Sequence, residues 1–289
     1  MNLEQETRFI LKKYGIKANK DLGQNFLVDD NVVRNIIDSA KVSKEDLIIE
    51  IGPGVGTLTK ELLEKAGKVI AVELDTRMIT ILKARFALFD NFELINNDIL
   101  KTDLNEIICK NINSISELKN VKIVANLPYY ITTPIIMKLL EEELNIETIT
   151  VMIQKEVANR LIAVPGERYA GAITYTVYYY AEGEAIVEVP KESFVPEPSV
   201  DSEVIQLKIR KTKDINVKDK QLLFKIIKYA FMQRRKTLIN ALEKTDLFKD
   251  KQEVIKILNK LGVDEKIRGE ALTLEQFVRL ADIIKQAED

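Results

Sequence analysis

Two short segments carry the residues best suited to chemistry. Residues 50–56 (EIGPGVG) place an acid before three glycines spaced Gly-x-Gly-x-Gly, and residues 126–129 (NLPY) join an amide, a proline and an aromatic ring. Glycines let the backbone turn sharply and let a ligand approach without a Cβ atom in the way. A dinucleotide fingerprint needs a glycine where this chain has Thr57, and the sequence holds no phosphate-loop motif. The turn therefore predicts a nucleoside-like ligand rather than a pyrophosphate.

Two further acids follow the next predicted strands. Glu73 ends the second strand, 23 residues after Glu50, and Asp98 follows the third. A carboxylate at the first position can accept hydrogen bonds from both ribose hydroxyls of an adenosine, and one at the second can accept from the adenine amine. Either acid alone is equally compatible with a helix cap or a solvated strand end. Together with the glycine turn they predict an adenosine-containing ligand.

The segment at 126–129 predicts methyl transfer to an adenine amine. The side-chain oxygen of Asn126 and the backbone carbonyl of Leu127 can accept the amine hydrogens, so that the delocalised lone pair turns toward a methyl group. Pro128 stiffens the loop and cannot donate a competing N–H, and Tyr129 offers an aromatic face to stack the extruded base. No strong general base is needed, because the nitrogen loses its proton easily once it is methylated. The alternative interpretation is an ordinary turn after a strand.

Composition excludes several classes of enzyme. The 289 residues include one cysteine and no histidine, which excludes Ser-His-Asp hydrolysis, Cys-His chemistry and His-ligated zinc, and we expect no metal site. No apolar run reaches the roughly 20 residues that cross a bilayer, and the first 20 residues lack the apolar segment of a secretion signal. We therefore expect a cytoplasmic protein with no membrane partner.

The pattern of apolar runs predicts an α/β fold. Strand-like runs at 46–51, 68–74, 92–96, 121–125 and 149–153 alternate with helical spacing at 57–66, 76–86 and 134–143. Such alternation is typical of a doubly wound, mostly parallel, Rossmann-like sheet covered on both faces. Runs at 185–189 and 204–209 would close it as an antiparallel pair, giving seven strands, while residues 170–181 fit a strand or a helix.

The predicted secondary structure changes after Lys211, from alternating strands and helices to helices alone. Helical spacing over 219–242, 251–261 and 273–286 predicts a small all-α domain at 212–289, after a methyltransferase domain at 1–211. The net charge of −2 hides a basic block, because residues 208–236 hold eleven Lys and Arg against two acids. Such a block favours a polyanion partner, although a solvated helix face is the alternative. We predict that Arg234, Arg235 and Lys236 lie on one helix and neutralise RNA phosphates there.

The order of these motifs resembles a known family. Residues 21–29, 50–59, 126–129, 154–161, 194–204 and 233–242 look like the motifs of the ribosomal RNA adenine dimethylases, and the resemblance spans about residues 20–281. It implies that S-adenosylmethionine is the methyl donor, in a Rossmann-like methyltransferase domain. The match is nearest to bacterial members that dimethylate the N6 amines of two adjacent adenosines near the 3′ end of 16S rRNA. That implies a role in small-subunit biogenesis, with a precursor of the small ribosomal subunit as partner and a monomeric enzyme.

The resemblance also assigns residues. It implies S-adenosylmethionine contacts for residues of the QNFL segment, of the glycine turn and of the segment 126–129, and for the two strand-end acids. These residues are Asn25, Leu27, Gly52, Gly54, Glu73, Asp98 and Asn126. It implies that Tyr129 holds the target base. The chain departs from the family at Tyr130, where Asn is common, and at Asn97, where Gly is frequent. Tyr130 therefore bears on the shape of the base pocket.

Three other functions stay open at this point. One is a related 23S rRNA methylase that confers macrolide resistance, although residues 194–204 and 233–238 favour the small-subunit enzyme. A DNA adenine methylase would usually carry Asp or Ser with Pro-Pro in place of Asn-Leu-Pro. A non-catalytic RNA-binding or assembly factor on a methyltransferase scaffold is of another class, and the intact acids and Asn126 argue against it.

Overall fold

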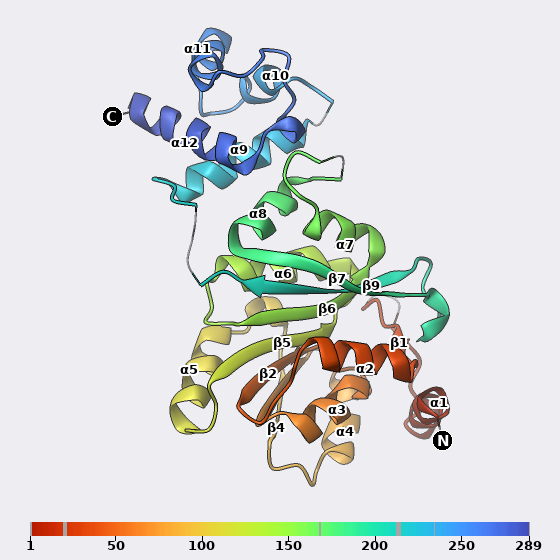
Figure 1. Ribbon diagram of the computed structural model, residues 1–289. Helices are drawn as coiled ribbons and strands as arrows, with labels where there is room; N and C mark the ends of the chain where they lie inside the picture. Colours follow the sequence, from red (N-terminus) through yellow and green to blue (C-terminus); the bar gives the residue numbers. More distant parts are fainter. Residues whose placement is uncertain (1, 20–21, 168, 212–214, 234, 289) are drawn as a thin grey trace. The chain divides into compact units, whose positions relative to one another are not determined.

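The computed structural model describes residues 2–19, 22–167, 169–211, 215–233 and 235–288. The chain forms two compact units, the first made of Met1–Ala158 and Gly183–Ile209 and the second of Asn159–Glu182 and Arg210–Asp289. Figure 1 follows the chain through both units in sequence colours. Residues 159–182 therefore cluster with the C-terminal helices, and a separate domain at 212–289 stays a prediction.

A seven-stranded sheet organises the first unit. Its strands follow one another in the order β4-β3-β2-β5-β6-β9-β7. The pairs β2–β3, β3–β4, β2–β5 and β5–β6 are parallel, and β9 pairs antiparallel with β6. The strands are β2 (Asp46–Ile51), β3 (Lys68–Glu73), β4 (Phe92–Asn96), β5 (Asn120–Asn126), β6 (Thr148–Gln154), β7 (Ala181–Val189) and β9 (Ser202–Ile209). The predicted mostly parallel, seven-stranded fold is confirmed.

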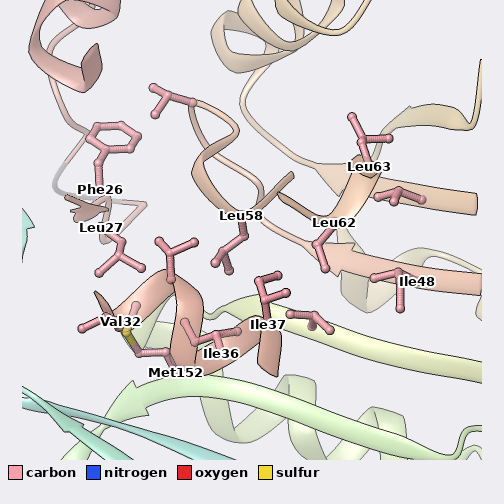
Figure 2. Close-up of a cluster of buried hydrophobic side chains, with 14 of the residues drawn as sticks. Phe26, Leu27, Val32, Ile36, Ile37, Ile48, Leu58, Leu62, Leu63 and Met152 are labelled. Atoms are coloured by element: carbon pink, nitrogen blue, oxygen red, sulfur yellow. The ribbon is translucent and has the colours of Figure 1, made fainter. Parts of the chain in front are cut away.

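Both faces of the sheet are buried. Ile48 and Ile49 are adjacent on β2 and neither is exposed, so the alternating side chains of this strand enter the protein core on both sides. On one side Ile48, Val124 of β5 and Met152 of β6 pack with apolar side chains of the neighbouring helices (Figure 2). The near-continuous apolar strands thus explain the predicted double layer of helices.

Helices connect the strands and begin at well-defined caps. Asp29 and Asp75 accept backbone N–H groups at the start of α2 and α4, which satisfies donors that have no partner inside the helix. The helices in the first 158 residues are α1 (Leu3–Lys13), α2 (Asp30–Ser39), α3 (Thr57–Lys65), α4 (Thr76–Arg85), α5 (Leu104–Ser114) and α6 (Thr132–Glu141), and α7 (Lys155–Ile162) crosses into the second unit. Four of these, α1, α2, α5 and α7, were not among the predicted elements.

A two-stranded ladder lies outside the large sheet. Strand β1 (Phe26–Leu27) pairs antiparallel with β8 (Phe194–Val195), with Leu27 opposite Phe194. This pairing joins the predicted QNFL motif to the predicted proline-rich loop, two segments far apart in the sequence. Both belong to the first unit.

The second unit is helical. Its core is built around Tyr175 of α8 (Ala172–Tyr180), whose ring packs edge-on against Phe277 and whose hydroxyl donates to the Leu272 carbonyl at 2.6 Å. The ambiguous segment at 170–181 is therefore mainly helix. The remaining helices are α9 (Lys220–Met232), α10 (Leu238–Leu242), α11 (Lys251–Leu261) and α12 (Leu274–Glu288). No helix in the described ranges is both long and apolar enough to span a membrane.

The single helix predicted over 219–242 is wrong. Helix α9 ends at Met232, and α10 begins after Thr237, whose hydroxyl accepts the N–H of Asn240 at 3.4 Å. A threonine whose side chain satisfies the next backbone donors starts a new helix rather than extending the old one. Arg235 and Lys236 therefore lie in the connecting turn and not on a helix face.

Candidate functional site

A pocket opens at the carboxyl ends of the first four parallel strands. The open space within it, mouth included, is about 990 Å³. The predicted residues at the strand ends all contribute to its wall, together with the segment before β1. These residues are Asn25, Leu27, Gly52, Gly54, Glu73, Asp98, Asn126, Leu127, Pro128 and Tyr129.

The glycine turn needs its glycines for backbone geometry and for space. Gly54 has φ of +57°, and a Cβ atom there would lie 3.3 Å from the ring of Phe26. Gly56, with φ of +87°, begins α3, and a Cβ atom on it would lie 2.5 Å from the ring of Phe86. Gly52 adopts φ of +66° at the pocket wall. The left-handed conformations of Gly52 and Gly54 bring the backbone itself to the pocket surface, whereas Gly56 leaves room for the ring of Phe86.

The carboxylate of Glu73 binds the backbone of the glycine turn. Its Oε2 accepts the N–H of Gly54 at 3.1 Å and its Oε1 accepts the N–H of Asp75 at 2.8 Å. The residue is 7% exposed, and burial raises the pKa of its carboxyl group above the ordinary value. Each carboxylate oxygen retains a second lone pair that a ligand hydroxyl can use.

Glu50 is a second buried acid in the pocket wall, and the list of predicted contacts omitted it. It is 1% exposed, and its Oε2 accepts the hydroxyl of Thr59 at 2.7 Å. Burial in an apolar strand, with Glu73 nearby, raises the pKa of Glu50 to about 8. The sequence had marked Glu50 as the acid before the glycine turn, and its place near the end of the apolar run at 46–51 was the signal for a buried position.

Asp98 both lines the pocket and caps a short helix. Its Oδ1 accepts the N–H of Leu100 at 2.9 Å at the start of the 3₁₀ helix η1 (Ile99–Lys101). The residue is half-buried and stands at the pocket wall. The cap and the pocket position, treated as alternatives from sequence, therefore coexist.

Asn126 ends β5 and its amide orientation is determined by a neighbour. Its Nδ2 donates to the backbone carbonyl of Asn25 at 3.2 Å. Because a carbonyl oxygen can only accept, the nitrogen must face Asn25, and the Asn126 Oδ1 is left as the acceptor. Pro128 follows, with its carbonyl accepting the hydroxyl of Thr132 at 3.0 Å.

Tyr129 and Tyr130 point to different neighbours. The hydroxyl of Tyr129 lies 2.5 Å from the Ser202 hydroxyl on β9, and burial raises the pKa of the tyrosine. The ring of Tyr130 lies against Gly23, where an added Cβ atom would be 3.3 Å from its Cδ1. Asp98 adds to burial in raising the Tyr130 pKa, so this phenol lies toward the two strand-end acids.

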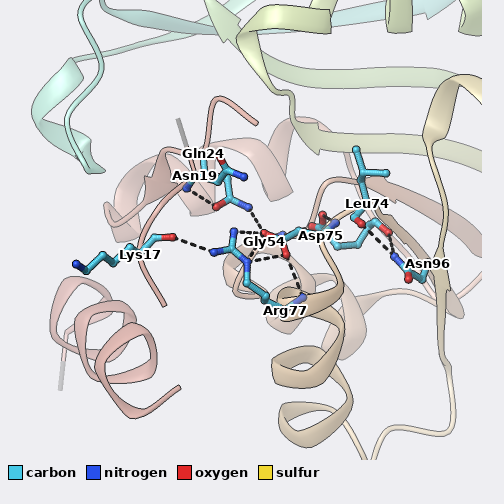
Figure 3. Close-up of polar contacts among 9 residues, drawn as sticks. Lys17, Asn19, Gln24, Gly54, Leu74, Asp75, Arg77 and Asn96 are labelled. Atoms are coloured by element: carbon cyan, nitrogen blue, oxygen red, sulfur yellow. Dashed lines mark hydrogen bonds and ion pairs between the residues drawn. The ribbon is translucent and has the colours of Figure 1, made fainter. Parts of the chain in front are cut away.

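The segment at residues 22–27, here called the strap, forms one wall of the pocket. Asn25 donates its side-chain N–H to the Gly23 carbonyl at 3.2 Å, and the Leu27 carbonyl accepts the hydroxyl of Thr57 at 3.4 Å. Leu27 itself is 2% exposed and packs in the core. Gln24, which was not among the predicted contacts, bonds to Asp75 (Figure 3).

The predicted RNA-binding cations belong to the second unit. Arg235 and Lys236 are exposed in the turn between α9 and α10, and the Lys236 N–H donates to the Gln233 carbonyl at 2.8 Å. Arg234 lies outside the described residues. Among the described side chains no cluster of three or more Asp, Glu or Cys residues is arranged to hold a metal ion.

Several known proteins are similar to this chain in sequence and in fold. Residues 15–286 match the family model of the ribosomal RNA adenine dimethylases. The chain belongs to this family. A relative from Clostridium acetobutylicum, named ribosomal RNA small subunit methyltransferase A, is 47% identical over 97% of this chain and 99% of its own. The predicted family resemblance is confirmed, and with it an S-adenosylmethionine-dependent methyltransferase fold.

Two solved structures of the same fold extend the comparison. A dimethyladenosine transferase from Plasmodium falciparum is 27% identical, with a TM-score of 0.72 over 88% of this chain and 95% of its own. The 23S rRNA methyltransferase ErmE is 25% identical, with a TM-score of 0.66 over 91% of this chain and 100% of its own. Both resemble this member of the family in fold, and the small-subunit relative is much closer in sequence.

Proposed function

We propose that this member of the family transfers methyl groups from S-adenosylmethionine to the N6 amines of two adjacent adenosines near the 3′ end of 16S rRNA, giving N6,N6-dimethyladenosine. The observation that carries the proposal is one pocket whose wall holds Asn126–Tyr129 together with the strand-end acids Glu73 and Asp98. The small-subunit relative supports the choice of RNA. The enzyme acts in the cytoplasm, as a monomer, on a precursor of the small ribosomal subunit.

The pocket residues fit the cofactor. Glu73 has both oxygens fixed by backbone donors and turned to accept ribose hydroxyls, while Gly52 and Gly54 leave the backbone open to close approach. Asp98 offers an acceptor to the adenine amine at the next strand end. Asn25 and Leu27 cover the ligand from the strap. When bound, S-adenosylmethionine would supply a methyl group activated by a positively charged sulfur.

The reacting end consists of Asn126–Tyr129. The Asn126 Oδ1 and the Leu127 carbonyl accept the two hydrogens of the adenine amine, which takes the nitrogen lone pair out of conjugation and directs it at the methyl carbon. Tyr129 stacks the extruded base. After the new N–C bond forms, the cationic amine releases a proton to water. A second methyl group requires a second molecule of S-adenosylmethionine, and one of the two acceptors then holds the single remaining N–H. Orientation and charge are the contribution of the protein.

The second unit holds the RNA by charge. The basic residues of the segment 208–236 favour a polyanion partner, and Arg234, Arg235 and Lys236 would neutralise phosphates without reading sequence. Such contacts orient the RNA while the pocket selects the base.

Labelled S-adenosylmethionine tests the proposal directly. The protein is incubated with small subunits that lack the modification, with large subunits, and with naked RNA of each. Label in small-subunit RNA is expected. Label confined to large-subunit RNA would identify the enzyme as a functional counterpart of the 23S methylase instead, and label on protein or on nothing would contradict an RNA methyltransferase.

A further inference from the structure

Gln24 joins the strap to the loop after β3. Its Nε2 donates to Asp75 Oδ2 at 2.8 Å, and its Oε1 accepts the N–H of Asn19 at 2.8 Å (Figure 3). Both partners have fixed polarity, because a carboxylate only accepts and a backbone N–H only donates. Among side chains of this length only glutamine provides one donor and one acceptor, so the position requires this residue type.

Asp75 is held in its charged form for this contact. Arg77 donates to both of its carboxylate oxygens, with Nε lying 2.9 Å from Oδ1 and Nη2 lying 2.5 Å from Oδ2. This contact lowers the pKa of Asp75 below the ordinary value. Arg77 also donates from Nη1 to the Lys17 carbonyl at 3.3 Å, which attaches the chain before the strap to the same loop (Figure 3).

The clamped strap reaches both ends of the pocket. At one end Asp75 donates its backbone N–H to Glu73, the acid assigned to the ribose. At the other end the residue after Gln24 presents its carbonyl to the amide of Asn126. A shift of the strap would therefore disturb the cofactor wall and free the Asn126 amide to rotate.

We propose that Gln24 is a positioning residue that, through Asp75, fastens the strap across the cofactor pocket and so fixes the acceptor orientation of Asn126. The role rests on the proposed function, because it concerns the same cofactor and the same reaction. The clamp acts on binding and on turnover together: an unfastened strap weakens cofactor binding, and at saturating cofactor it leaves Asn126 misoriented.

Four variants test the clamp. Gln24→Met keeps the length and removes both hydrogen bonds, while Gln24→Glu sets a carboxylate against Asp75. In the double variant Gln24→Glu with Asp75→Asn, the introduced carboxylate accepts from the introduced amide and also from Asn19. The amide nitrogen takes the place of the oxygen that accepts from Arg77 Nη2, so the exchange restores only the contact with residue 24. Gln252→Met, on the exposed side of α11, is the matched control for removal of a glutamine amide.

The readouts are the dissociation constant for S-adenosylmethionine by calorimetry and kcat at saturating cofactor, with thermal unfolding as the check on folding. Gln24→Met is expected to weaken binding about tenfold, as for loss of a hydrogen bond to a charged group, and to lower kcat as well. Gln24→Glu is expected to lose more, and the double variant to recover part of that loss. The control variant is expected to bind as the wild type does.

The proposed function and the clamp are contradicted by different results. Wild-type protein that does not bind S-adenosylmethionine would contradict the proposed function itself. If the wild type binds S-adenosylmethionine and Gln24→Met has the same affinity and the same kcat, only the clamp is contradicted. If Gln24→Met does not fold, the comparison of Gln24→Glu with the double variant decides, and absence of any recovery in the double variant overturns the proposal.

Discussion

Asn126 donates its side-chain N–H to the backbone carbonyl of Asn25 at 3.2 Å, from a position 101 residues away in sequence. The contact determines which atom of a rotatable amide stays available as an acceptor, since the nitrogen is engaged and Oδ1 is left. It also gives Asn25 a role through its backbone, besides the cofactor contact that its family motif implies.

The methyl-transfer activity of Asn126 variants should depend on which hydrogen-bonding atoms the new side chain retains. Asn126→Ala removes the acceptor and is expected to lower methyl transfer at least ~100-fold, in the range found for loss of a key transition-state hydrogen bond. Asn126→Asp keeps an acceptor but loses the donor to Asn25, so its activity should lie between alanine and wild type. The measurement is kcat at saturating cofactor. Near wild-type turnover in the alanine variant would mean that Asn126 does not contact the amine.

The hydroxyl pair of Tyr129 and Ser202 should act as one unit. Tyr129→Phe and Ser202→Ala each remove the same hydrogen bond, and each is expected to raise KM for RNA about fivefold, from a net value of about 1 kcal/mol. The double variant should lose little more than either single one. Tyr129→Ala, which also removes the ring, should be far worse. Additive losses in the double variant would show that the two hydroxyls serve separate purposes.

Glu73 should control the affinity for the cofactor. Glu73→Gln replaces one acceptor oxygen by an amide nitrogen that must face the N–H of Gly54 or of Asp75, so donor meets donor. The dissociation constant for S-adenosylmethionine is expected to rise by about tenfold or more. Asp98→Asn, at a half-exposed position, is expected to have a smaller effect. An unchanged affinity in Glu73→Gln would place the ribose elsewhere.

Glu50 should make the stability of the free protein fall with rising pH. Its folded pKa of about 8 lies above the ordinary carboxyl value of 4.5, so between these values the folded state binds a proton that the unfolded state has released. Stabilisation from this group is complete below the unfolded pKa and is lost as pH rises toward the folded one. Glu73, whose pKa is also raised, adds in the same direction.

Glu50→Gln should remove most of that slope. The variant keeps a group that can bond to Thr59 and carries no charge, so unfolding free energies measured by urea from about pH 5 to 9 should vary less than those of the wild type. Parallel curves for the two proteins would mean that Glu50 is ionised in the folded state at neutral pH.

The cations between α9 and α10 should act through phosphates. Arg235→Ala and Lys236→Ala are each expected to weaken RNA binding for every sequence tested and to lower the salt dependence of log K by about one unit. The affinity for S-adenosylmethionine should not change. A loss limited to one RNA sequence would instead indicate contact with a base.

The sequence predicted the sheet and the pocket wall well because both depend on short-range patterns. The strands at 46–51 and 92–96 have the predicted bounds, since continuous apolar runs that end in glycine or polar residues identify buried parallel strands. The strand-end acids follow from the same pattern. Their common position in one pocket follows from the parallel topology.

Other features depend on contacts that no local pattern records. Gln24 and Asp75 are 51 residues apart, and Tyr129 and Ser202 are 73 apart, so neither pair could be recognised from spacing. The break between α9 and α10 was missed because the helical spacing of apolar residues continues across Thr237. The helix α2 is different, because it does have a local pattern that went unpredicted: Asp29 supplies its cap, and its buried residues Val32, Val33, Ile36 and Ile37 recur at helical spacing.

The most direct test of the account is the identity and position of the methylated nucleoside. Small subunits that lack the modification are treated with the wild type or with Asn126→Ala, and the 16S rRNA is digested and mapped by mass spectrometry. The account predicts N6,N6-dimethyladenosine at two adjacent positions near the 3′ end with the wild type, and unmodified adenosine there with the variant. Methyl groups on another base or another RNA, or equal dimethylation by both proteins, would contradict it.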